Sequence, residues 1–381
     1  MLLAVILRYS LRDFISGDFR NFTRPWYKFI AEKGGLPALA HDFTNYTPLY
    51  PTLMTGVYYL LPGVSTVIAV KLIAVIFDFV AAIFAFRLVR LKYIGGIAPY
   101  FAFMAILFSP TVVLNSSFWG QSDVIYTAGL LACVYFLAID RETLGFLAFG
   151  FAFAFKLQSL FLAPFLFILW LTGKVSWKRF LLIPIVYLVT VIPSWLTGRP
   201  LSELLSVYLT QAGFYRDLTK NAPNLYQWFS NKQYDILYPA GMIWTAALMV
   251  LFSWGVYKSR TKITTDRMIQ LATISALVMP YFLPKMHDRY FFAVDVLSIV
   301  FAFYFPRYFF VPILIGLVSL LSYVPFLFHF RVIPFSQLAL VLLVVIVVLM
   351  RHLIMTLTAA PAISIVNSEV AALSEHNPSP D

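Results

Sequence analysis

Long apolar runs, separated by short polar segments, constrain the fold of this chain more than any other feature. A helix needs about 20 mostly apolar residues to cross a bilayer, and about 17 is the lower limit. The chain is 61% hydrophobic and only 12% charged, whereas a soluble domain has about 25% charged residues. The apolar runs lie near residues 1–16, 53–90, 97–115, 123–139, 143–158, 159–172, 180–196, 237–257, 268–284, 290–306, 308–328 and 335–350. This pattern predicts an all-α polytopic membrane protein with about eleven or twelve transmembrane helices, some of them short or bent.

The basic residues predict how the helices are oriented, because cytoplasmic loops carry an excess of Lys and Arg. One set of alternate loops is rich in these residues: Arg90, Lys92, Arg141, Lys174, Lys178, Arg179, Lys258, Arg260, Lys262, Arg267, Arg307 and Arg351. The opposite loops hold most of the polar and aromatic residues outside the apolar runs and are segments 17–52, 115–123, 197–236, 285–289 and 329–334. We expect the first set on the cytoplasmic side and the functional residues on the outer face.

Two outer loops, 17–52 and 197–236, are long enough to carry helices of their own. Apolar residues recur in them at helical spacing, namely Phe19, Phe22, Trp26, Phe29 and Ile30 in the first loop and Leu204, Leu205, Tyr208 and Leu209 in the second. Both segments are therefore predicted to form amphipathic helices that lie in the membrane interface. Residues 1–358 are expected to form a single transmembrane domain, and the polar tail 359–381 is expected to be disordered.

The formal net charge of +11 does not indicate a nucleic-acid-binding protein. The cations flank apolar runs, where membrane orientation and attraction to anionic lipid explain them. The single cysteine, Cys133, lies inside an apolar run, which excludes a disulfide within one chain and favours a packing role.

The segment from Leu283 to Phe292 is the most informative for function. It places Lys285, His287, Asp288 and Arg289 between two apolar runs. Ionisable groups at a membrane cost free energy, so a cluster of four indicates a functional site. Arg binds two oxygens with its planar fork and Lys adds a compact charge, so this cluster suits a phosphate. The alternative is a basic loop that anchors a helix end at the lipid head groups, although His and Asp would add nothing to such an anchor.

Further polar groups lie at the ends of other apolar runs. They are Asp18, Asp42, Trp119, Gln121, Asp123, Lys156, Gln158, Asn224 and Tyr226. Asp18 follows a span, where it is either a helix cap or a general base. Trp119, Gln121 and Asp123 suit a carbohydrate, because aromatic faces stack on sugars and amides bind hydroxyls; a helix cap beside an interfacial Trp is the alternative. Lys156 lies between phenylalanines and must find a partner or reach the membrane surface.

These segments, in this order, resemble motifs of the GT-C superfamily of polytopic glycosyltransferases. The resemblance is strongest to bacterial mannosyltransferase-like relatives of the enzyme that adds the second mannose to GPI anchors. The matching segments are Gly17-Asp18, Pro25-Trp26-Tyr27, Asn45 to Tyr50, Trp119-Gly120-Gln121-Ser122-Asp123, Lys156-Leu157-Gln158, Pro223-Asn224-Leu225-Tyr226 and Pro284 to Tyr290. Thr47, Leu157 and Asp288 depart from the family pattern, but none of these departures removes a candidate acid, base or cation.

The resemblance implies a GT-C type fold and an inverting transfer of mannose or another hexose from a polyprenyl-phosphate donor. The acceptor would be a hydroxyl of a glycan, lipid or protein at the outer face of the plasma (inner) membrane. It assigns the general base to Asp18, the donor phosphate to Lys285, His287, Arg289 and Lys156, and the sugar or acceptor to Asp42, Trp119, Gln121, Asp123, Gln158, Asn224 and Tyr226. A divalent ion, Mg or Mn, held by Asp18, Asp42 or Asp123 is a further expectation, because hard cations bind carboxylate and phosphate oxygens together.

Two other classes of protein explain the sequence less well. A lipid-linked sugar carrier or flippase would place its charges near the membrane midplane and often contains inverted repeats. Here the polar clusters lie in loops of one face, and the sequence shows no internal repeat. A noncatalytic membrane scaffold would leave the combination of Asp18 with the 285–289 cluster unexplained.

Overall fold

A computed structural model describes residues 1–213 and 215–358, and its elements are almost entirely helical. Its α-helices are α1 (Leu2–Ser10), α2 (Arg24–Glu32), α3 (Leu49–Leu60), α4 (Thr66–Lys92), α5 (Ala98–Phe108), α6 (Pro110–Val113), α7 (Asp123–Ala138), α8 (Glu142–Phe155), α9 (Ala163–Leu171), α10 (Leu182–Leu196), α11 (Leu201–Ala212), α12 (Tyr234–Lys258), α13 (Thr265–Phe282), α14 (Phe292–Tyr304), α15 (Phe310–Phe328) and α16 (Phe335–Thr358). Two short strands, β1 (Thr219–Lys220) and β2 (Met286–His287), pair in parallel. The tail 359–381, expected to be disordered, lies outside the described residues.

The helices confirm an all-α, multi-pass membrane protein. Among the described residues, five helical segments are long and apolar enough to cross a bilayer: Thr66–Lys92, Trp177–Leu196, Asn231–Lys258, Pro306–Phe328 and Phe335–Thr358. A sixth span results if α5 is counted together with the segment Pro110–Trp119, to which it is bent by 43°. The prediction of eleven or twelve spans also counted apolar runs that form shorter helices, such as α7 and α8.

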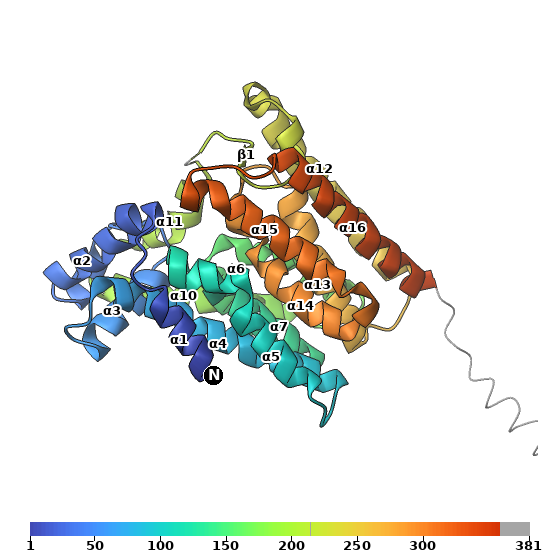
Figure 1. Cartoon of the computed structure of the whole chain (residues 1–381), viewed down its shortest axis with the longest axis horizontal. Coiled ribbons are helices and arrows are strands. Elements are labelled where there is room, and N and C mark those ends of the chain that lie inside the picture. Colours follow the sequence, from blue (N-terminus) through green and yellow to red (C-terminus); the bar gives the residue numbers. More distant parts are fainter. Residues whose placement is uncertain (214, 359–381) are drawn as a thin grey trace, which may run out of the picture.

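Helix α7 lies at the centre of the bundle and packs against α4, α8 and α14 (Figure 1). Most of its residues are buried around its whole circumference, as expected of a helix that is apolar on every face. Large side chains of α10, α12 and α16 such as Val189, Ile243 and Val347 are instead exposed. These outer helices therefore present apolar surface suited to lipid.

Both predicted loop helices are present. α2 buries Trp26, Tyr27 and Ile30, while Phe22, which was expected on the same face, is partly exposed. α11 buries Leu204 and leaves Leu209 79% exposed. The apolar residues of each helix thus divide between the protein and its surroundings, because an interfacial helix packs on the bundle on one side and leaves apolar groups free for lipid on another.

The loops predicted on the cytoplasmic side meet at two places. Lys92 donates to Asp266 Oδ2 at 2.8 Å and to the Tyr304 carbonyl at 2.7 Å. Lys174 donates to Asp140 Oδ1 at 2.6 Å. Loops that the alternation of basic segments predicted on one side of the membrane are therefore in contact. Which side they occupy stays a prediction.

Candidate active site

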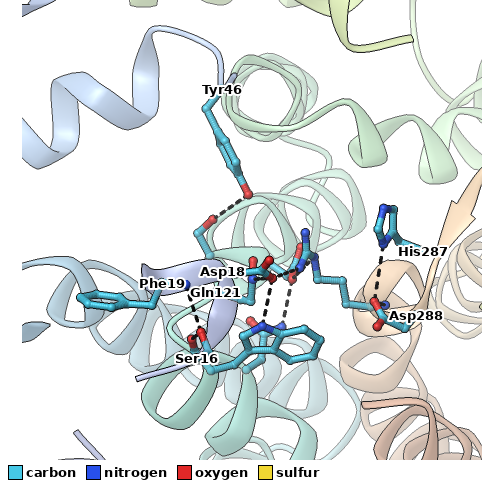
Figure 2. A network of polar contacts seen from close by, with 12 residues as sticks. Ser16, Asp18, Phe19, Tyr46, Gln121, His287 and Asp288 are labelled. Carbon is cyan, nitrogen blue, oxygen red and sulfur yellow. Dashed lines mark hydrogen bonds and ion pairs between the residues drawn. The ribbon is translucent and has the colours of Figure 1, made fainter. Parts of the chain in front are cut away.

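Asp18 is the centre of a polar cluster that joins three distant parts of the chain (Figure 2). Its Oδ2 accepts hydrogen bonds from Trp119 Nε1 at 3.1 Å, Gln121 Nε2 at 2.6 Å and Arg289 Nη1 at 2.9 Å. Asp18 precedes a π-helical turn, Phe19–Thr23, but its side chain makes no capping hydrogen bond to it. The helix-cap alternative for Asp18 is therefore not supported, and its carboxylate belongs to the cluster.

Asp123 is the second carboxylate of the cluster and is fully buried. Its Oδ1 is ion-paired with Lys156, and its Oδ2 accepts from Asn115 Nδ2 at 2.9 Å and lies 3.8 Å from Arg289 Nε. Arg289 thus bridges Asp18 and Asp123. Burial by itself lowers the pKa of an arginine, but the two carboxylates raise the pKa of Arg289 well above its ordinary value. Arg289 is a permanent cation.

Trp119 packs against the cluster formed by Asp18, Asp123 and Arg289. Its ring is fully buried, stacks on Phe326 with 4.9 Å between centroids and meets Tyr323 edge-on at 5.2 Å. The Arg289 guanidinium carbon lies 5.6 Å from the centre of the Trp119 ring, a cation–π distance. The indole therefore orients Asp18 and Arg289, whereas the resemblance gave it a contact with sugar.

The 283–289 loop is held in an unusual backbone conformation. Lys285 has a φ of +64°, which is uncommon for a residue other than glycine and occurs more often at functional sites. Its N–H donates to the Leu218 carbonyl at 2.7 Å, and the next residues, Met286 and His287, pair with β1. The Lys285 ammonium lies 5.5 Å from the ring centre of Tyr238. The second long outer loop thus fixes the direction in which the cationic loop runs.

His287 faces aromatic and charged neighbours. Its ring centroid lies 5.4 Å from that of Tyr215 and 5.5 Å from that of Tyr290, and its Nδ1 is 3.8 Å from Asp288 Oδ1. Burial lowers the pKa of His287 below its ordinary value of 6.5, although the nearby Asp288 carboxylate opposes this shift. The imidazole is therefore neutral at pH 7 and can donate one hydrogen bond.

Asn224 and Tyr226 bind the backbone at the start of the 283–289 loop. Asn224 caps a 3-10 turn by accepting from the Tyr226 N–H at 3.2 Å, and it donates to the Leu283 carbonyl at 3.2 Å. The Tyr226 hydroxyl donates to the Phe282 carbonyl at 3.0 Å, and a Cβ added at Gly241 would lie 1.9 Å from that hydroxyl oxygen. A side chain at position 241 would therefore displace the Tyr226 hydroxyl. Both residues act on the loop through its backbone, whereas the resemblance placed them at the sugar or acceptor.

Asp42 and Gln158 differ from the rest of the predicted set. Asp42 is ion-paired with Arg199 and is 64% exposed, so it joins the two long outer loops to each other. Gln158 directly follows the Lys156 segment, and its Oε1 is buried with no hydrogen-bond partner among the described residues. A buried acceptor without a partner costs about 1–3 kcal/mol unless a ligand or water satisfies it.

The carboxylates proposed to bind a divalent ion are each paired with a cation. Asp18 and Asp123 share Arg289, Asp123 also pairs with Lys156, and Asp42 pairs with Arg199. Within residues 1–213 and 215–358, no three His, Cys, Asp or Glu residues are close enough to hold one metal. This donor set, already neutralised by lysine and arginine, does not fit a resident metal ion.

A second polar network beneath the cluster was not identified from the sequence. Arg8 Nε donates to Asp78 Oδ2 at 2.7 Å, and Ser116 Oγ donates to the same oxygen at 2.6 Å. Lys71, one of two buried charges on α4, contacts the carbonyls around Asp18 and Trp119. Lys71 and Asp78 are seven residues apart in an apolar helix and so share one face; that spacing is the signal that could have revealed them.

Comparisons with known proteins find similar folds among solved structures. No family model and no curated protein matches the sequence. A crystal structure of ArnT from Cupriavidus metallidurans bound to undecaprenyl phosphate superposes with a TM-score of 0.58 at 15% identity, covering 92% of this chain and 69% of that one. ArnT in the apo state gives 0.55 at 12% identity, with 91% and 74% covered. The chain therefore shares the polytopic helical fold of ArnT.

Proposed function

We propose that this protein is an integral-membrane, inverting glycosyltransferase that transfers a hexose, mannose in the first instance, from a polyprenyl-phosphate donor to an acceptor hydroxyl. The observation that carries the proposal is the pairing of Asp18 with Arg289 in a chain with the ArnT fold. A carboxylate and a guanidinium side by side supply the two groups that the reaction needs: a base for the hydroxyl and a cation for the departing phosphate.

Asp18 is the proposed base. The three hydrogen bonds that described residues donate to it all fall on Oδ2, and the side chain keeps 22% of its surface exposed. Oδ1 accepts no hydrogen bond from the described residues and is the oxygen to which an acceptor hydroxyl would donate. Asp18 takes the hydroxyl proton as the acceptor oxygen bonds to the sugar C1 from the side opposite the phosphate, which inverts that carbon.

Arg289, His287 and Lys285 are the proposed ligands of the donor phosphate. As the bond from C1 to the phosphate oxygen breaks, its electron pair stays on the phosphate. The fixed charge of Arg289 and a hydrogen bond from neutral His287 stabilise the negative charge that develops there. No general acid is needed, because the lipid phosphate leaves as an anion.

Lys156 has a different proposed part from the one that the resemblance gave it. Its ammonium is paired with Asp123 in a buried position, so it neutralises that carboxylate rather than meeting the donor. Asp123 in turn faces Arg289 Nε, which fixes the guanidinium plane. Gln158 Oε1, which has no hydrogen-bond partner among the described residues, is the atom proposed to accept from a sugar hydroxyl.

The proposed location of the reaction is the non-cytoplasmic face of the plasma (inner) membrane. Segments that carry the cluster are the ones that alternate with the basic loops, and outer segments of this kind have a lower content of Lys and Arg. The acceptor is then a glycan, lipid or protein hydroxyl on that side, and the isoprenoid tail of the donor stays in the bilayer.

Purified protein in detergent or proteoliposomes tests the proposal with a panel of polyprenyl-phosphate hexoses that includes mannose and glucose. The expected result is release of polyprenyl phosphate together with transfer of the sugar to an added acceptor or to water. Movement of the intact donor across the vesicle membrane, with no polyprenyl phosphate released from any donor, would replace this proposal with a carrier.

A further inference from the structure

Lys71 is a buried lysine whose whole hydrogen-bonding capacity is used on backbone carbonyls. Only 3% of the residue is exposed, and it projects from the apolar helix α4. Its ammonium donates to the carbonyls of Arg12 and Phe14 at 2.8 Å each and to that of Phe118 at 3.2 Å. Three acceptors match the three N–H groups of an ammonium. An apolar side chain would leave these carbonyls without this donor.

These carbonyls belong to the two segments that build the cluster around Asp18. Arg12 and Phe14 lie in the segment between helix α1 and Asp18, and Phe118 directly precedes Trp119. The aliphatic part of Lys71 also packs beside Gly120, since a Cβ added there would lie 3.4 Å from the Lys71 Cε. Gly120 has a φ of +78° and lies between Trp119 and Gln121, the residues that both donate to Asp18.

Ser16 makes a second connection between the same segments. Its Oγ donates to the Trp119 carbonyl at 2.7 Å and accepts from the Phe19 N–H at 3.1 Å. Figure 2 shows Ser16 beside Phe19, close to Asp18. Two independent contacts, one from Lys71 of helix α4 and one from Ser16, therefore hold the Asp18 turn against the turn that carries Trp119 and Gln121.

We infer that Lys71, assisted by Ser16, is a positioning residue for the proposed reaction. It sets the place of Asp18 by fixing the two backbone segments to one another, without contact with the substrate. This inference rests on the proposed function, because it takes Asp18 as the base. Displacing a reacting group by about 1 Å lowers the rate about a hundredfold. The buried hydrogen bonds of Lys71 are therefore expected to control turnover rather than donor binding.

The test compares Lys71→Met with Lys92→Met. Met keeps the length of the lysine stem beside Gly120 but has no N–H to donate. Lys92 is a matched control because it lies on the same helix and also bonds a backbone carbonyl, that of Tyr304, but at the opposite end of α4. Lys71→Met is expected to lower kcat by about ten- to a hundredfold with an unchanged donor KM, whereas Lys92→Met keeps the parent kcat.

Hydrogen exchange supplies a readout that does not depend on activity. The amides of residues 16–19 and 115–121 are expected to exchange faster in Lys71→Met than in the parent, and at the parent rate in Lys92→Met. Parent kcat in Lys71→Met would overturn the inference, and so would an equal loss of kcat in both variants. Failure of the parent to act on any donor would overturn the proposed function instead. Hydrogen exchange would then decide whether Lys71 holds the two backbone segments together.

Ser16→Ala keeps the test decisive if Lys71→Met does not fold. It removes one hydroxyl, leaves α4 intact and deletes the bond to the Trp119 carbonyl. A several-fold lower kcat at constant donor KM is expected, and a parent kcat in this variant would overturn the inference.

Discussion

Arg289 donates from Nη1 to Asp18 Oδ2 at 2.9 Å, across 271 positions of sequence. The two residues proposed as phosphate ligand and as base are therefore bonded to each other. A donor phosphate placed against Arg289 competes with Asp18 for the same guanidinium. Binding of the donor would thus release the carboxylate at the moment when a base is required.

Asp18→Asn isolates the function of the base. Asparagine has nearly the same shape but cannot take a proton, and transfer is expected to fall by about two to four orders of magnitude. Donor binding is expected to survive, because the 285–289 loop is unchanged. The measurements are the transfer rate and the donor KM, obtained with the sugar that gives the highest rate in the panel.

Asp13→Asn is the control for this substitution. Asp13 lies in the same segment, forms an ion pair with Arg12 and is 78% exposed, and exposed pairs contribute at most about 1 kcal/mol to stability. It is expected to retain parent activity. A well-folded Asp18→Asn variant that transfers sugar at the parent rate would remove Asp18 from the mechanism.

Arg289→Lys and Arg289→Ala separate charge from shape. Lysine keeps a positive charge but cannot bridge Asp18 and Asp123 with a planar fork. Alanine removes a charged hydrogen bond to the phosphate, with an expected loss of about 1.5–3 kcal/mol in donor binding, and it leaves Asp123 with one cation fewer. We expect donor KM to rise and kcat to fall in both variants, more strongly in Arg289→Ala.

Thermal unfolding must accompany these measurements, because removing one partner from a buried ion pair costs about 3–5 kcal/mol of stability. Arg216→Ala is the matched control: Arg216 also pairs with an aspartate, Asp235, but both side chains are exposed. An unchanged donor KM in a folded Arg289→Ala variant would contradict the assignment of Arg289 to the phosphate.

The membrane class and the residues of the cluster could be predicted from the sequence, but their contacts could not. Apolar run length predicts helices in a bilayer, and the motifs predict Asp18, Asp123 and Arg289 as polar groups of one face. Which of them touch depends on tertiary packing: Trp119 was expected to face a sugar and is instead buried beneath Asp18. The apolar pattern does not separate spans by length either, since shorter helices such as α7 and α8 carry the same pattern as the five long segments.

Lys71 shows a second limit. A lysine inside an apolar run is visible in the sequence, yet its acceptors are backbone carbonyls, which every residue type supplies. No side-chain pattern identifies such a partner. Asp42 shows the converse, because its motif suggested a binding role and its contact is an ion pair between two loops.

Metal removal tests the conclusion drawn from the paired carboxylates. Asp18 and Asp123 share Arg289, so activity is expected to persist at the parent rate after treatment with EDTA and gel filtration. Added Mg²⁺ or Mn²⁺ is expected to leave kcat unchanged. Loss of transfer with EDTA, restored by either ion and not by NaCl at equal ionic strength, would show that the donor phosphate recruits a metal to this site.

The pH dependence of stability reports on His287. Its pKa in the folded protein lies below 6.5, through burial and the nearby charges of Arg289 and Lys220, with Asp288 opposing. As the pH falls through about 6.5 the unfolded chain binds a proton that the folded protein does not, so the free energy of unfolding decreases. The decrease levels off once the pH lies below the folded pKa.

His287→Gln is expected to reduce this loss of stability, because glutamine does not titrate. The measurement is the midpoint of thermal unfolding in detergent between pH 8 and pH 5, compared with the parent and with His329→Asn, a change at an exposed histidine. If His287→Gln loses as much stability as the parent over this range, the imidazole is not held neutral by burial. The hydrogen bond proposed between neutral His287 and the donor phosphate would then have to be replaced by an interaction with a charged imidazolium.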